Sequence, residues 1–148
     1  MDKDFDIDTF LQRPLFAHLA TTCDEGARES PVWYLWEDGS MWLVGNDRDT
    51  FPRRLRRDPR CAVGVVDFDL QRGLLQHVGV RGITTVDALD RSRLGRLLRR
   101  YLGDDEAMWN SRFRESIIDR LSLMIRIDPT SIVARDQSYF ASAFRELS

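Results

Sequence analysis

The sequence predicts a mostly β or α+β fold, in which about six or seven mainly antiparallel strands form a small barrel with peripheral helices. Three observations predict it. Short segments rich in branched and aromatic residues are separated by glycine-containing turns in the first 45 residues. An apolar run and a long segment with two internal glycines follow one short helix, and the main helical periodicity falls after residue 89. A length of 148 residues suits one domain over 1–148.

The first 45 residues are expected to contain one short helix and three strands. Asp8 or Thr9 can cap the helix, and Pro14 ends it because the residue before a proline avoids helical geometry. Turn sequences at 24–26 and 37–39 separate the strands. The predicted strands cover residues 16–22, 29–36 and 41–45. Two consecutive hairpins imply an antiparallel meander.

A helix and two further strands are predicted next. An aspartate–threonine pair can cap a helix over residues 50–57, whose first turn holds a proline at little cost. The apolar residues 61–68 predict a buried strand. Residues 74–86 predict a long strand, in which Gly79 and Gly82 indicate bends or a close approach of two backbones.

Helical spacing dominates the segment that follows. Asp90 can cap a first helix, which Gly103 ends. A second helix is predicted over residues 106–119. The chain is then expected to close with two strands, over 121–127 and 131–135, broken at an Asp-Pro pair.

The composition excludes several classes of function. The net charge is −2, from 22 basic and 24 acidic residues, so no global field would attract nucleic acid or an anionic membrane. No apolar run approaches the roughly 20 residues that span a bilayer, and the acidic first residues do not resemble a signal peptide. Cys23 and Cys61 lie far apart in the chain, which favours a reducing, cytoplasmic setting.

The chain carries no recognisable catalytic motif. Two histidines, His18 and His77, and two cysteines at these spacings make a poor zinc site, so no metal is expected. His18 is expected to pack within its strand. Nucleophile-elbow, phosphate-loop and dinucleotide-turn motifs are absent. No catalytic residue is therefore assigned. If the protein is an enzyme, a cofactor would carry its reactivity. A binding module would also lack catalytic motifs.

Two arginine clusters each have two interpretations. The clusters are Arg53, Arg54, Arg56 and Arg57, and Arg93, Arg96, Arg99 and Arg100. Either can be a solvated helix face with leucines turned inward. The first cluster directly follows a predicted strand, so its guanidiniums and the N–H groups of its helix can also hold a phosphate.

Five segments together resemble a known family. They are residues 17–22 (AHLATT), 30–36 (SPVWYLW), 56–63 (RRDPRCAV), 80–84 (VRGIT) and 125–135. In this order and spacing they resemble the flavin-binding split barrels of the pyridoxamine 5′-phosphate oxidase-like class. The resemblance implies a split β-barrel that forms a homodimer, with FMN sites at the interface to which both subunits contribute.

The resemblance also implies which residues hold the cofactor. In the family, the second strand lies along the flavin ring, the end of the third strand and the following loop and helix hold the phosphate, and a polar residue on the fifth strand faces the flavin. The corresponding positions are Ser30, Pro31, Val32, Trp33 and Tyr34; Gly45, Asn46, Arg48, Thr50, Phe51, Arg53 and Arg54; and Gln76 and His77.

The chain departs from the family pattern at important positions. Basic residues common in flavin-binding members are replaced by Glu29, Asp49 and Phe51, and a carboxylate repels a phosphate. Either neighbouring arginines take over the phosphate contact or the phosphate site has been lost. Tyr34 stands at the position of the lysine that contacts vitamin B6, so oxidation of pyridoxamine phosphate is not expected.

Strand alternation adds a prediction about the aromatic residues. Trp33 and Leu35 should share one face of the second strand, and Tyr34 and Trp36 the other. Such aromatic side chains, including Trp42 on the next strand, either fill the core or an interface or contact a flavin ring or planar substrate.

The predicted function is an FMN-dependent oxidoreductase that acts on a small, unidentified substrate. One alternative is a non-catalytic flavin- or haem-binding module, in which His77 would be the axial ligand to test. Another is a cofactor-free dimeric barrel that binds a ligand. A deazaflavin could also take the place of FMN. No nucleic-acid or membrane partner is expected.

Overall fold

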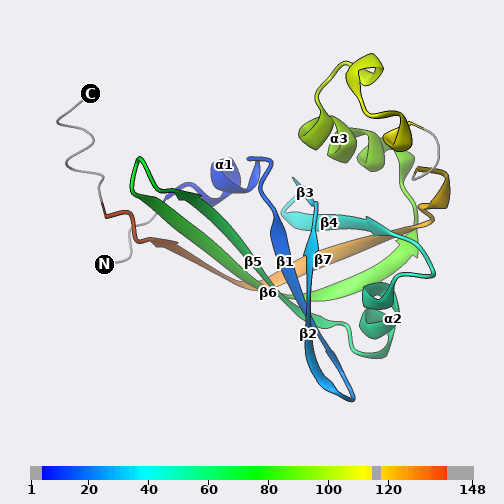
Figure 1. The fold of residues 1–148 in the computed structure, drawn as a ribbon. Coiled ribbons are helices and arrows are strands. Elements are labelled where there is room, and N and C mark those ends of the chain that lie inside the picture. The colour runs from blue at the N-terminus through cyan, green and yellow to red at the C-terminus, as the bar shows by residue number, and fades with distance from the viewer. Residues whose placement is uncertain (1–4, 115–117, 140–148) are drawn as a thin grey trace.

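The computed structural model describes residues 5–114 and 118–139 of the chain. Within these residues, seven strands form one antiparallel sheet in the order β2-β1-β5-β6-β7-β4-β3 (Figure 1). The strands are β1 (Ala17–Cys23), β2 (Gly26–Val32), β3 (Leu35–Glu37), β4 (Ser40–Gly45), β5 (Arg60–Asp69), β6 (Leu74–Ala88) and β7 (Leu123–Asp136). The sheet is not closed, because β2 and β3 do not pair with each other. The predicted mostly antiparallel fold is confirmed.

Three helices and three short turns cover parts of this sheet. The helices are α1 (Ile7–Leu11), α2 (Thr50–Arg57) and α3 (Arg91–Leu102), and the single 3₁₀ turns are η1 (Glu106–Met108), η2 (Ser111–Phe113) and η3 (Ile118–Arg120). No helix among the described residues combines the length and the apolar character needed to cross a membrane.

One face of the central strands is packed and the other is open. Period-two alternation turns one set of side chains inward, among them Leu19 of β1, Val63 and Val65 of β5 and Val78 and Val80 of β6, all nearly inaccessible to solvent. Burial of each such side chain contributes roughly 1.5–3 kcal/mol. The residues between them point to the opposite, outward face, so the strands present a second surface that the described chain leaves uncovered.

The expected meander is wrong, because β2 and β3 separate at Trp33 and Tyr34 and end on opposite edges of the sheet. The Tyr101 hydroxyl of α3 lies between the backbone groups of Tyr34, accepting its N–H at 3.1 Å. Trp33 stacks on the Tyr101 ring with centroids 4.6 Å apart. These contacts replace the sheet partners that a continuous strand over 29–36 would have had.

The predicted alternation of the aromatic residues is confirmed. Tyr34 and Trp36 belong to the main core. Leu35 belongs to a second, smaller cluster under α3, and Trp33 packs against that cluster. The chain therefore uses successive residues to join two separate apolar clusters.

The last strand is continuous rather than broken. The pairing of β6 and β7 shifts at Arg81 and Gly82, so that Thr130 of β7 is the extra residue of a bulge. A Cβ at Gly82 would lie only 2.7 Å from the Ile127 side chain and 2.8 Å from the Asp128 carbonyl. Gly82 is thus a point of close backbone approach, as predicted, and the Asp-Pro pair is accommodated by the bulge.

The helix predictions were right for α2 and α3 and wrong for residues 106–119. Asp90 caps α3 by accepting the N–H groups of Ser92 and Arg93. The second segment forms η1, η2 and η3 instead, with 115–117 outside the described residues. Asp105 and Asn110 each cap a new turn, because short polar side chains compete with helix continuation. At the N-terminus, Asp6 rather than Asp8 or Thr9 caps α1.

Candidate functional site

A polar hollow of about 690 Å³ lies between the β1–β2 hairpin and α2. We call it the arginine hollow. Its lining comprises Cys23, Asp24, Glu25, Arg28, Glu29, Ser30, Thr50, Arg53, Arg54 and Arg57. Of the residues predicted to bind the cofactor, the hollow brings together Ser30 from the second strand and Thr50, Arg53 and Arg54 from the following helix.

Arg54 is the best-positioned cation of the arginine hollow. Leu55, which is only 2% exposed, anchors α2 in the core, and this sets the direction of the neighbouring arginine. The Arg54 Nε donates to the buried Thr21 hydroxyl at 2.6 Å, and Nη2 lies 3.5 Å from the Ser30 hydroxyl. Both partners are neutral, so the charge of Arg54 is held in place without being compensated.

Arg53 is the second uncompensated cation. Its Nη2 lies 3.5 Å from the Arg48 carbonyl, at the limit of a hydrogen bond. Other arginines of the hollow are paired: Arg57 with Asp24 at 3.2 Å, and Arg28 with a neighbouring glutamate at 2.9 Å. Among the residues that the structure describes, Arg53 and Arg54 are thus the two guanidiniums of this hollow without a carboxylate partner.

The loop before α2 satisfies its own polar groups. The Asp49 carboxylate accepts the Asn46 N–H at 2.9 Å, and the Asn46 side-chain oxygen accepts the N–H groups of Arg48 and Asp49 at 2.8 and 3.1 Å. Phe51 packs against the main core. Asn46, Arg48 and Asp49 line a separate hollow of about 440 Å³. The structure therefore divides the predicted phosphate-binding segment between two neighbouring hollows.

Most of the predicted strand residues lie elsewhere. Tyr34 is fully buried, its ring faces the Arg100 guanidinium at 4.6 Å, and burial raises the pKa of its hydroxyl well above the ordinary value. Trp33 stacks with Tyr101 and with Phe113. Val32 contacts the main core. In the described chain, the side chains of these residues support α3 and the core rather than line the arginine hollow.

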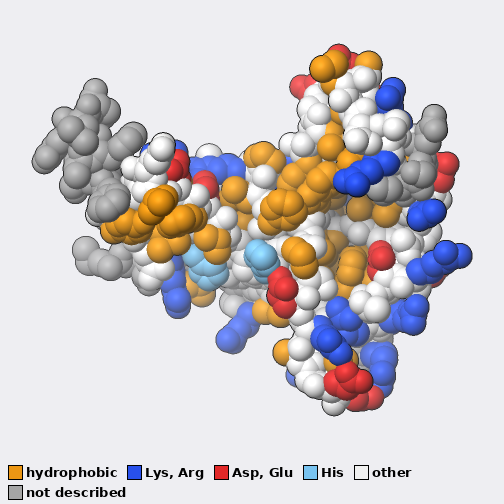
Figure 2. Space-filling view, viewed as in Figure 1, with side chains coloured by type: hydrophobic (Ala, Val, Ile, Leu, Met, Phe, Trp, Pro, Cys, Tyr) orange, Lys and Arg blue, Asp and Glu red, His pale blue; other side chains and the backbone are white. Residues whose placement is uncertain are grey.

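The two histidines share the outward face of the sheet, where Figure 2 shows them among apolar side chains. The predicted packing role of His18 is wrong: the side chain is 56% exposed, and Nδ1 contacts Glu29 at 2.5 Å. The His77 ring lies against Gly64 and Gly79, because a Cβ on either glycine would come within 3.6 Å of it. Gln76 instead donates to the Asp136 carboxylate at 3.1 Å.

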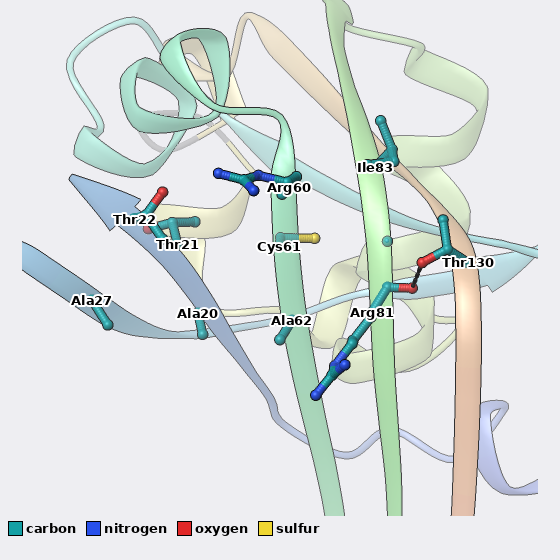
Figure 3. Close-up of a pocket in the computed structure, with 11 residues that line it drawn as sticks. Ala20, Thr21, Thr22, Ala27, Arg60, Cys61, Ala62, Arg81, Ile83 and Thr130 are labelled. Carbon is teal, nitrogen blue, oxygen red and sulfur yellow. Dashed lines mark hydrogen bonds between the residues drawn. The ribbon is translucent and has the colours of Figure 1, made fainter.

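A second hollow, of about 480 Å³, lies on the outward face of β1, β5 and β6 (Figure 3). We call it the outward hollow. Its floor carries Ala20 and Ala62, and Arg81 stands at its side. No motif marks it in the sequence. The only signal is that small residues and two arginines, Arg60 and Arg81, occupy outward positions on adjacent strands, and this signal can be read only when the strand order is known.

The arginine hollow has the chemistry of an anion site. Guanidiniums form strong, charge-assisted bonds to phosphate oxygens, and the Ser30 and Thr50 hydroxyls can add neutral donors. A phosphate group fits this donor set. In the described part of the chain, no group of three histidine, cysteine or acidic side chains is arranged to hold a metal ion.

Comparisons with known proteins address the fold. No protein-family model and no curated protein matches the sequence. Among solved structures, an F420 reductase matches with a TM-score of 0.66 and 21% identity over 88% of this chain and 98% of that chain. HutZ, described as the haem storage protein of Vibrio cholerae, matches with a TM-score of 0.66 and 13% identity over 95% and 99%.

A candidate pyridoxamine 5′-phosphate oxidase from Listeria innocua matches with a TM-score of 0.60 and 14% identity over 90% of this chain and 96% of that chain. These structural matches extend over almost the whole length of both compared chains, so they concern the complete sheet and not a local motif. Together with the antiparallel, unclosed seven-stranded sheet, they show that the chain has the split-barrel fold of the pyridoxamine 5′-phosphate oxidase-like proteins.

Proposed function

We propose that this chain is an FMN-dependent oxidoreductase of the pyridoxamine 5′-phosphate oxidase-like class, which works in the cytoplasm as a homodimer on a small, unidentified substrate. The observation that carries the proposal is the arginine hollow. It holds two guanidiniums without a carboxylate partner among the described residues, next to two hydroxyl groups. It lies beside the segment in which the family resemblance implies the cofactor phosphate.

Arg54 would make the main contact with the FMN phosphate. Its position is fixed by Thr21 and Ser30, and it breaks no ion pair when an anion arrives. Arg53 would add a second charge from the same helix. FMN would supply hydride- and electron-transfer chemistry when bound; these residues would bind and orient it.

The two carboxylates that replace basic residues have partners other than Arg53 and Arg54. Glu29 contacts His18 on the neighbouring strand at 2.5 Å. Asp49 accepts a backbone N–H of its own loop. Neither carboxylate forms a pair with Arg53 or Arg54 in the described chain. This supports a working phosphate site despite the departures from the family pattern.

The outward face supports the homodimer. Phe16, Phe68 and Val66 are between 44% and 57% exposed, which is unusual for apolar side chains on one open sheet face and favours a covering partner. In the proposed dimer, the flavin ring would lie between β2 of one protomer and the outward face of its partner. His77 is at the position implied for the polar residue facing the ring.

A haem-binding module is the second candidate. The His77 ring lies on the outward face against two glycines, and imidazole is a usual axial ligand of haem iron. HutZ, which shares the fold, is described as a haem storage protein. A deazaflavin is a further cofactor of the flavin type, and an F420 reductase shares the fold.

The absorbance spectrum of freshly purified protein, repeated after addition of excess FMN and desalting, tests the proposal. We expect a retained flavin spectrum and, by light scattering, twice the chain mass of 17.3 kDa. Reduction of the bound flavin by a nicotinamide donor would then open the search for substrates. Protein that retains no FMN would sink the flavin proposal, and a Soret band after haem addition that is lost in His77→Ala would replace it with the haem module.

A further inference from the structure

The outward hollow has the features of a second ligand site, separate from the arginine hollow. We propose that it binds a small organic carboxylate with a compact apolar body, and that the Arg81 guanidinium pairs with the carboxylate. The proposal does not depend on FMN binding, because the two hollows share no lining residue.

Arg81 carries the uncompensated charge of this hollow. It is exposed on β6, opposite Ala62 of β5 and Ser131 of β7. Its carbonyl accepts a hydrogen bond from the Thr130 hydroxyl at 3.1 Å, which holds the backbone next to the bulge. Within the described chain, the guanidinium has no hydrogen bond or ion pair, and no carboxylate lines the hollow.

The other polar groups at this end of the strands are already satisfied. Asp58 accepts two bonds from the Arg60 guanidinium, at 3.0 and 2.8 Å, one from the Arg60 N–H at 3.1 Å, and one from the Thr22 hydroxyl at 2.9 Å. These contacts hold the pKa of the Asp58 carboxyl well below its ordinary value. The ion pair neutralises Arg60, so an incoming anion would be attracted to Arg81.

The floor of the hollow favours an apolar body. Ala20, Ala27 and Ala62 provide small side chains, and Ile83, which is 43% exposed, adds an apolar wall. Figure 3 shows Ala20, Ala62 and Arg81 pointing to the same side of the sheet. Burial raises the pKa of the Cys61 thiol to about 11, so this side chain stays neutral. A volume of about 480 Å³ suits a small molecule.

The number of arginines without a carboxylate partner in each hollow indicates which kind of anion that hollow can bind. One planar guanidinium matches the two oxygens of a carboxylate in a bidentate pair. A phosphate dianion is better served by two cations, which the arginine hollow offers and the outward hollow does not. We therefore assign carboxylates to Arg81 and phosphates to Arg53 and Arg54.

Titrations of the protein with benzoate, followed by ¹H–¹⁵N chemical shifts, test the site. Benzamide is the neutral counterpart of benzoate. We expect shifts at the amides of Thr22, Ala62 and Ile83, and about tenfold weaker binding of benzamide, because a charge-assisted pair is lost. Arg81→Gln should weaken benzoate binding about tenfold and abolish its advantage over benzamide, whereas Arg91→Gln, an exposed arginine on α3, should change neither.

A second variant separates the cavity from the charge. Ala62→Leu fills the floor and keeps Arg81, so it should weaken benzoate and benzamide alike, while thermal unfolding and light scattering report that fold and assembly are retained. FMN retention should be unchanged in Arg81→Gln. Equal affinities for benzoate and benzamide, displacement of benzoate by inorganic phosphate, or shifts confined to the arginine hollow would each overturn the proposal. So would burial of Arg81 against a second copy that leaves no room for the probes.

Discussion

The two arginine-rich helices look alike in the sequence and differ in the structure. On α3, Arg93 pairs with Glu37, Asp38 and Asp90, and Arg96 pairs with Glu37. On α2, Arg54 contacts only hydroxyl groups and Arg53 only a distant carbonyl in the described chain. One helix uses its charges to attach itself to the β3–β4 hairpin, and the other leaves two guanidiniums without a carboxylate partner among the described residues.

The difference comes from what each helix packs against. The β3–β4 turn carries Glu37 and Asp38, so carboxylates are available beside α3. Beside α2, strands β1 and β2 present the hydroxyls of Thr21 and Ser30 instead. Arginine content alone therefore does not indicate a phosphate site; the charge of the opposing surface does.

The largest expected effect tests the structural role of α3. Arg100 donates to the carbonyls of Leu11, Gln12 and Arg13 at the end of α1 and lies over the Tyr34 ring. Arg100→Ala should lower the free energy of unfolding by about 3 kcal/mol, because several carbonyls lose their donor. Urea unfolding measures this. Arg99→Ala, on the exposed side of the same helix, is the control and should stay within about 0.5 kcal/mol of wild type.

The next effect concerns the charge kept on α2. Arg54→Met should raise the dissociation constant for FMN about tenfold to a hundredfold, which corresponds to about 1.4–2.8 kcal/mol. Quenching of FMN fluorescence measures it. Arg96→Met, the matched change on α3, should leave the constant within about twofold. Equal losses in the two variants would contradict the distinction between the helices.

A smaller effect is expected where α3 meets the hairpin. Glu37 contacts Arg93 at 3.1 Å and Arg96 at 2.7 Å, and its side chain is only 23% exposed. Glu37→Gln should therefore cost about 1 kcal/mol of unfolding free energy. The loss should shrink in 1 M salt, where exposed ion pairs are screened. FMN retention should not change, since this hairpin is remote from the arginine hollow.

Acid should destabilise both helix ends. Hydrogen bonds donated by Arg60 lower the pKa of Asp58 after α2, and the bond donated by the Arg93 N–H lowers the pKa of Asp90 before α3. Because the pKa of each carboxyl is lower in the folded than in the unfolded protein, its interactions stabilise the fold at pH values above the ordinary pKa of 3.8. This contribution is lost as the pH falls below that value. Thermal unfolding between pH 6 and pH 3 should show this decline. Asp58→Asn should make it shallower; an unchanged slope would mean that Asp58 does not contribute.

The smallest effect is expected at Arg56 of α2. Its guanidinium lies 3.5 Å from Asp47, and both side chains are largely exposed. Arg56→Ala should change the unfolding free energy by less than about 0.5 kcal/mol and FMN affinity by less than about twofold. A large loss of FMN affinity would mean that the phosphate contact lies on the other side of the helix from Arg54.

Local patterns in the sequence determined much of the secondary structure. The bounds of α2, the cap of α3 and the positions of β5 and β6 follow from apolar spacing, capping residues and turns, all of which act between near neighbours in the chain. The same locality explains the failure at 106–119, where helical spacing was outweighed by caps at Asp105 and Asn110.

The tertiary structure alone decided which residues meet. The sheet order separates β2 from β3, and the contact that divides them comes from Tyr101, 67 residues away from Tyr34. The partners of each arginine and the outward hollow also depend on strands that are adjacent only in space. A charge or a small residue acquires its role from the surface opposite it, and that surface is set by long-range packing, which no local pattern encodes.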